Sequence, residues 1–190
     1  VWTSNDPGTD FSGGDPATNG RWVQNPAFNT MVNDFNTDLD IPTQNFVAAD
    51  SYEQVRDFFL SQDSSQPVVL VGHSWGGGNA LEYANRLSAD GIQVDGVITI
   101  DPYQGNPDIS RRYTDTGDYS PTSAPQGSIN INLYQSESFL KGRNSNTKDN
   151  MLNIDVGSIS NLGSNPHINI VGNQYTYNVA LGTIHVIHRN

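Results

Sequence analysis

The fold of this chain is decided by the stretch Val68-Val69-Leu70-Val71-Gly72-His73-Ser74-Trp75-Gly76-Gly77. Its first four residues are aliphatic and three of them are valine, which predicts a strand buried on both faces. After this stretch, Ala80, Ala84 and Leu87 recur at helical spacing and predict an amphipathic helix. The stretch therefore predicts a strand that turns sharply into a helix, with a serine at the turn.

Ser74 has a glycine two residues before it and another two residues after it. With 18 glycines in 190 residues, a Gly-x-Ser-x-Gly pattern arises by composition in about one chain in six. Its place between a predicted strand and helix makes it more specific, because side chains at Gly72 and Gly76 would collide with the reversing chain. The pattern predicts a nucleophile elbow; a Ser74 that merely caps the helix is the simpler alternative.

Hydrophobic periodicity predicts alternating strands and helices along the chain. Strands are predicted at residues 45–49, 68–71, 97–100, 129–134 and 151–156, with a possible strand end at 1–3. Helices are predicted at residues 26–39, 52–62, 75–88 and 175–188, the second of them capped by Asp50 or Ser51. This order predicts an α/β fold, a three-layer α/β/α sandwich with a mostly parallel central sheet, in a single domain over residues 1–190. Residues 103–127 form a long polar loop, which is typical of functional segments.

Three reactive side chains follow predicted strands, namely Ser74, Asp101 and His167, the last of them in a predicted loop. In parallel sheets the carboxyl ends of the strands meet at one edge, so these side chains are expected to converge. A serine hydroxyl needs a base to take its proton during attack, and a histidine oriented by a carboxylate can act as that base. The chain order Ser, Asp, His is one of the known orders of such triads.

Other residues compete for two of these roles. His73 is expected to support the turn, whereas His185 and His188 lie on the last predicted helix, where surface or packing roles are commoner. Glu137 follows the next strand and remains an open alternative to Asp101 as the acid. Weaker candidates for the acid are Asp95, near a turn, and Asp155, inside a strand.

The elbow with its strand, and the segment Val97–Pro102, resemble the nucleophile and acid segments of α/β-hydrolase lipases and esterases. Ile100-Asp101-Pro102 is similar to the acid segment of pancreatic-type lipases. The chain length resembles that of the compact bacterial lipases, in which the acid instead follows the next strand, so Glu137 stays open. The resemblance covers about residues 65–190. It implies a minimal α/β-hydrolase fold that cleaves carboxylic esters through Ser74, Asp101 and His167, with no cofactor.

The resemblance also implies an oxyanion hole. One donor is expected to be the backbone N–H of Trp75, the residue after the nucleophile. The second donor usually follows an early strand, often in a His-Gly segment, and no His-Gly occurs in this chain. Only the first residues could supply it, at Trp2 or Thr3, of which we favour Thr3.

Composition narrows the possible partners. The net charge of −11 argues against nucleic acid or an anionic membrane surface, and no apolar run is long enough to span a bilayer. The absence of cysteine excludes disulfides, thiol catalysis and Cys-ligated zinc. Acidic stretches at residues 6–15 and 108–118 lack EF-hand spacing, so no metal is expected. The chain begins at Val1 without methionine, which indicates processing or upstream trimming, and a secreted or extracellular location is favoured over a cytoplasmic one.

Two functions are consistent with these observations. The first is a serine esterase or lipase that acts on a small-molecule or lipid ester, which the elbow and the order of acid and histidine favour. The second is a catalytically silent binding or scaffold domain of the same fold, possibly part of a larger protein. The incomplete oxyanion segment favours this second function.

Overall fold

The computed structural model describes residues 2–5, 26–39, 42–47, 51–102, 124–137 and 150–189. Its centre is a six-stranded sheet in the order β2-β1-β3-β4-β5-β6, and every neighbouring pair is parallel. The strands are β1 (Trp2–Asn5), β2 (Gln44–Val47), β3 (Val69–His73), β4 (Gly96–Ile100), β5 (Ile129–Tyr134) and β6 (Leu152–Asp155). The helices are α1 (Pro26–Leu39), α2 (Tyr52–Leu60), α3 (Trp75–Ala89), α4 (Pro166–Asn169) and α5 (Gln174–Arg189). Most elements lie within two residues of their predicted bounds.

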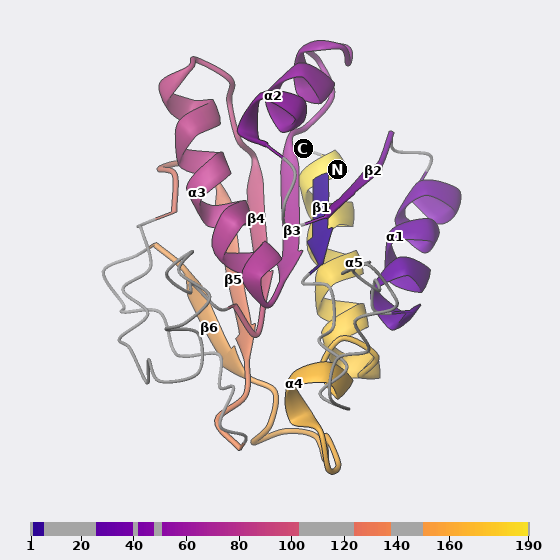
Figure 1. Cartoon of the computed structure of the whole chain (residues 1–190). Helices are drawn as coiled ribbons and strands as arrows, with labels where there is room; N and C mark the ends of the chain where they lie inside the picture. The colour runs from indigo at the N-terminus through magenta and orange to yellow at the C-terminus, as the bar shows by residue number, and fades with distance from the viewer. Residues whose placement is uncertain are drawn as a thin grey trace, which may run out of the picture.

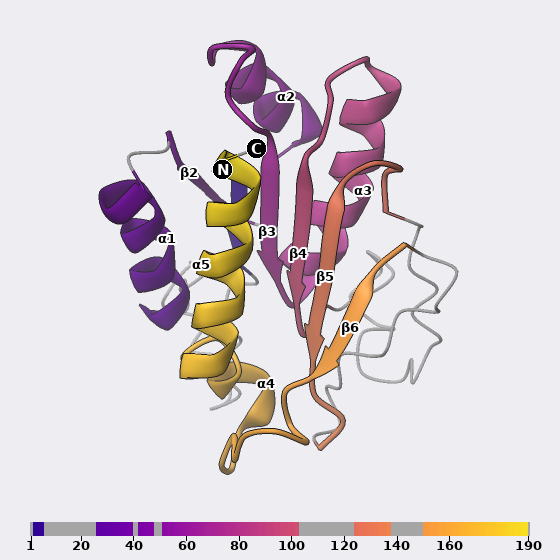
Figure 2. The same ribbon diagram turned by 180° about the vertical axis from the view of Figure 1, so that it is seen from behind.

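Helices cover the sheet on both faces, as Figures 1 and 2 show from opposite sides. α1 and α5 pack on one face, where Phe28, Phe35 and Ile184 meet alternate residues of the central strands. α2 and α3 pack on the other face, where Leu81 and Leu87 meet Leu70 of β3. The valine-rich run is buried throughout β3 because both of its faces are covered in this way. The predicted α/β/α sandwich is confirmed.

The helix predicted after residue 50 begins with a capping box. Ser51 is the N-cap: its Oγ accepts from the Gln54 N–H at 3.4 Å, and Gln54 Oε1 accepts from the Ser51 N–H at 2.7 Å. Each side chain thereby satisfies a backbone donor at the start of α2. Of the two predicted caps, the structure selects Ser51.

The predicted long polar loop falls largely outside this description. Of the long polar loop over residues 103–127, residues 103–123 lie outside the described part of the chain. Residues 124–127 lead directly into β5, and Ala124 is buried against the α2–α3 layer. Within the described ranges, no helix has the length and apolar character needed to cross a bilayer.

Candidate active site

Ser74 lies at the turn between β3 and α3, as predicted. Its backbone adopts φ 54° and ψ −123°, a conformation that non-glycine residues rarely adopt, and its N–H donates to the Ile100 carbonyl of β4 at 3.0 Å. A Cβ on Gly72 would lie 2.1 Å from the Gly76 carbonyl oxygen, so only glycine fits where the chain reverses. The predicted collision at Gly72 is confirmed, and the turn is strained at the serine itself.

Asp101 lies on the adjacent strand end, directly after β4. Its φ is also positive, at 43°, and its N–H donates to the Leu133 carbonyl of β5 at 2.6 Å. The side chain has no exposed surface. Its Oδ1 accepts from the Gln135 N–H at 3.2 Å, and its Oδ2 accepts from Gln135 Nε2 at 2.9 Å. Backbone geometry and the two donors of Gln135, just after β5, thus hold this buried carboxylate in place.

His167 lies beyond the carboxyl ends of the strands, where Figures 1 and 2 show α4. The sequence predicted a loop here, but His167 is the second residue of the one-turn helix α4, which Pro166 begins. Proline suits the first turn of a helix because its missing N–H would have no partner there. His167 Nδ1 lies 2.6 Å from Asp101 Oδ2, and its Nε2 lies 2.9 Å from Ser74 Oγ. The three predicted side chains therefore form one continuous hydrogen-bonded chain, and all three are buried.

The other candidate acids make different contacts. Both ring nitrogens of His167 are engaged by Ser74 and Asp101. Glu137 donates its N–H to Gln135 Oε1 at 2.8 Å, and Asp155 Oδ1 accepts from the Ser158 N–H. Asp95 Oδ2 accepts from the Val68 N–H, before β3 begins and thus at the opposite edge of the sheet. Geometry therefore selects Asp101 as the partner of the histidine.

His73 directly precedes Ser74, is fully buried and supports the segment that carries His167. Its Nε2 lies 2.9 Å from the carbonyl oxygen of His167, and since a carbonyl only accepts, this nitrogen carries the proton. Burial, followed by the nearby His167 ring, lowers the pKa of His73 from 6.5 to about 3. The ring is therefore neutral and acts as a donor that fixes the backbone at His167. His185 and His188 lie on α5, at the surface or partly buried.

The depressed pKa of His73 predicts a loss of stability in acid. Because the unfolded chain binds the proton near pH 6.5 and the folded chain only near pH 3, stability falls as the pH drops through this window. At pH 4.5 the free energy of unfolding should be about 2–3 kcal/mol lower than at neutral pH. Urea unfolding at several pH values should show a flatter dependence for His73→Gln, whose amide keeps a donor but does not titrate. The surface variant His188→Gln should keep the wild-type slope; equal slopes in all three proteins would contradict the assignment.

The expected oxyanion donors were Trp75 and Thr3. Trp75 is the first residue of α3, so its N–H is among those with no partner inside the helix and it directly follows Ser74. Thr3 pairs with Val71 inside the sheet, three residues before Ser74, which is about 10 Å along the strand. This register argues against Thr3 as the second donor, and Trp2 lies one residue farther back. The last residue of β1, Asn5, pairs with His73, one residue before Ser74.

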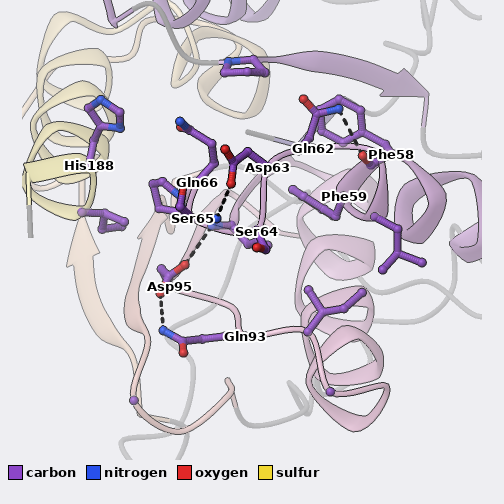
Figure 3. A pocket seen from close by; sticks show the side chains of 18 of the residues that line it. Phe58, Phe59, Gln62, Asp63, Ser64, Ser65, Gln66, Gln93, Asp95 and His188 are labelled. Carbon is purple, nitrogen blue, oxygen red and sulfur yellow. Dashed lines mark hydrogen bonds between the residues drawn. The ribbon is translucent and has the colours of Figure 1, made fainter.

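A hollow of about 820 Å³ lies at the other end of the sheet (Figure 3). It is lined by residues that precede or begin the strands, among them Gln66, Asp95 and Ile129, together with Phe58 and His188 of the flanking helices. Ser74, Asp101 and His167 all follow strands or lie beyond their carboxyl ends. This hollow is therefore separate from the site formed by Ser74, Asp101 and His167.

No group of His, Asp or Glu side chains within the described ranges is arranged to hold a metal ion. Acidic residues 6, 10, 15, 108, 115 and 118 fall outside those ranges. Sequence reasoning overlooked Gln135, which contacts both oxygens of the acid. The available signal was its position, because Gln135 directly follows β5 just as Asp101 directly follows β4.

Comparison with known proteins agrees with this architecture. A family model described as Alpha/beta hydrolase family matches residues 9–147, about three quarters of the chain. This match includes Ser74 and Asp101 and ends before His167. A search of curated proteins found no match. With an all-parallel sheet covered on both faces and an elbow at the end of β3, the chain belongs to the alpha/beta hydrolase family.

Proposed function

We propose that this chain is a serine hydrolase that cleaves carboxylic esters, with a small-molecule or lipid ester as substrate. The observation that carries the proposal is the buried chain from Ser74 Oγ through His167 to Asp101, with distances of 2.9 and 2.6 Å. A role in packing alone would not require a hydroxyl, an imidazole and a carboxylate to be linked in this order. Family membership supports hydrolytic chemistry at this place in the fold.

In the proposed first half-reaction, Ser74 Oγ attacks the acyl carbon while its proton moves to His167 Nε2. Asp101 Oδ2 holds the Nδ1–H and stabilises the imidazolium that forms. The carbonyl electron pair moves onto oxygen, and the Trp75 N–H donates to that oxyanion. The intermediate collapses, the alcohol leaves with the proton from Nε2, and the acyl group remains on Oγ.

In the second half-reaction, water attacks the acyl carbon and gives its proton to the same Nε2. Collapse of the new intermediate breaks the bond to Ser74 Oγ, which recovers the proton, and the carboxylic acid leaves. No cofactor takes part in these steps. The net charge of −11 repels anionic substrates at long range, which favours neutral esters.

A fluorophosphonate probe tests this proposal, because it phosphonylates only an activated serine. We expect one adduct on the folded protein, located by peptide mass spectrometry at Ser74, and none on protein unfolded in guanidinium. Turnover of p-nitrophenyl esters of increasing acyl length then separates small from lipid-like acyl groups. A folded protein with neither adduct nor turnover would refute the proposal and leave the silent scaffold domain.

A further inference from the structure

Gln135 occupies the first position after β5, and it has no exposed surface. β5 is the neighbour of β4, and the pairing continues past the end of β4, where the Asp101 N–H donates to the Leu133 carbonyl. The register of the sheet alone therefore places Gln135 beside the Asp101 carboxylate. It belongs to neither the elbow nor the histidine segment.

Gln135 holds the carboxylate at both oxygens. Its N–H donates to Asp101 Oδ1 at 3.2 Å and its Nε2 donates to Oδ2 at 2.9 Å. Its own Oε1 accepts from the Glu137 N–H at 2.8 Å, which requires the amide oxygen to face Glu137 and the NH₂ to face Asp101. The orientation of the amide is therefore fixed by a second bond on its far side.

A buried carboxylate needs such donors, because burial without hydrogen bonds strongly disfavours a charge. Oδ2 makes a second hydrogen bond, because it also accepts from His167 Nδ1 at 2.6 Å. A carboxylate held at one oxygen only could rotate about its terminal torsion and move Oδ2 away from the imidazole. Two donors from one residue restrict this rotation.

We propose that Gln135 is a positioning residue that holds the Asp101 carboxylate in register with His167. The inference rests on the proposed function, in which that histidine is the base. Hydrogen-bond partners that orient metal ligands typically contribute tenfold to a hundredfold to activity, and we expect an effect of the same size here. The competing interpretation is that Gln135 only ties the ends of β4 and β5 together.

The test is Gln135→Met, which preserves length and removes the side-chain donor while the backbone N–H remains. We expect kcat for a p-nitrophenyl ester to fall about tenfold to a hundredfold with KM unchanged. The same change in an Asp101→Asn background should cost less than about threefold, because no carboxylate remains to be held. Equal losses in both backgrounds, or an unchanged kcat, would overturn the proposal.

A matched control is Asn130→Leu, which removes a buried amide from the same strand far from the triad. Asn130 Nδ2 donates to the Asn150 carbonyl at 3.1 Å, before the amino end of β6. This variant should lose stability and keep the wild-type kcat. If it lowered kcat as much as Gln135→Met does, the effect would come from the strand and the proposal would fail.

A proton NMR readout separates this inference from the hydrolytic function. The proton between His167 Nδ1 and Asp101 Oδ2 should give a downfield signal that shifts or broadens in Gln135→Met. If wild type hydrolyses esters and this signal and kcat survive the substitution, the positioning role is wrong while the enzyme stands. If wild type hydrolyses nothing but the signal responds, the enzyme is wrong and the positioning role stands. Should Gln135→Met fail to fold, Gln135→Asn serves instead, because its amide is one methylene too short.

Discussion

Replacement of Ser74 by alanine should lower kcat for ester hydrolysis about a millionfold, the scale seen when such a triad loses its nucleophile. The reason is geometric: Ser74 Oγ is the atom that His167 Nε2 contacts at 2.9 Å, and alanine has no hydroxyl to attack the acyl carbon. Initial rates and fluorophosphonate labelling both measure the effect. KM should change little, because a single hydroxyl contributes little to ground-state binding.

Stability provides the control for this substitution. Alanine does not relieve the positive φ of 54° at position 74, so the variant should unfold at nearly the same urea concentration as wild type. Ser88→Ala, at the exposed far end of α3, should retain full activity. An active Ser74→Ala protein of unchanged fold would show that hydrolysis, if present, uses another group.

Replacement of Asp101 by asparagine should lower kcat about ten-thousandfold, whereas Glu137→Gln should leave it within about twofold of wild type. Gln135 Nε2 and His167 Nδ1 both donate to Asp101 Oδ2. If asparagine places its NH₂ at this point, that NH₂ faces two donors and cannot accept from either. The imidazole would then lose the acceptor that selects its tautomer. Glu137 engages Gln135 through its backbone N–H, which the substitution preserves.

Steady-state kinetics on both variants decides between the two acids. The reverse ranking, with Glu137→Gln inactive and Asp101→Asn nearly intact, would contradict the assignment of Asp101. Circular dichroism should show the wild-type fold in both proteins. The comparison is matched, because each change replaces one carboxylate oxygen by nitrogen at the end of a neighbouring strand.

Local pattern was sufficient to predict much of this molecule. The valine run before Gly72 and the helical spacing after it define the elbow, and Asp101 follows a strand of four β-branched residues. These signals are local, because burial on both faces leaves a continuous apolar run in the sequence. The convergence of Ser74, Asp101 and His167 followed from the rule that parallel strands end at one edge.

What the sequence did not indicate depends on register between strands. Thr3 was predicted to be a donor because residues 1–3 were expected to end an early strand, but β1 runs on to Asn5 and pairs Thr3 with Val71 rather than Ser74. Gln135 was overlooked because its role exists only once β5 lies beside β4 with Leu133 opposite Ile100. His167 was expected in a loop because four helical residues are too few to produce a periodic pattern.

The spacing of the triad along the chain has a consequence for synthesis. Ser74 and His167 are 93 positions apart, and Asp101 and His167 are 66 apart. Contacts between residues this far apart in the chain form late in folding, because the intervening strands must first take their places in the sheet. In the proposed reaction, a growing chain that has not yet emerged beyond residue 167 would carry a nucleophile without a base. We therefore expect reactivity to begin only after residue 167 has emerged, when the elbow has already left the ribosome.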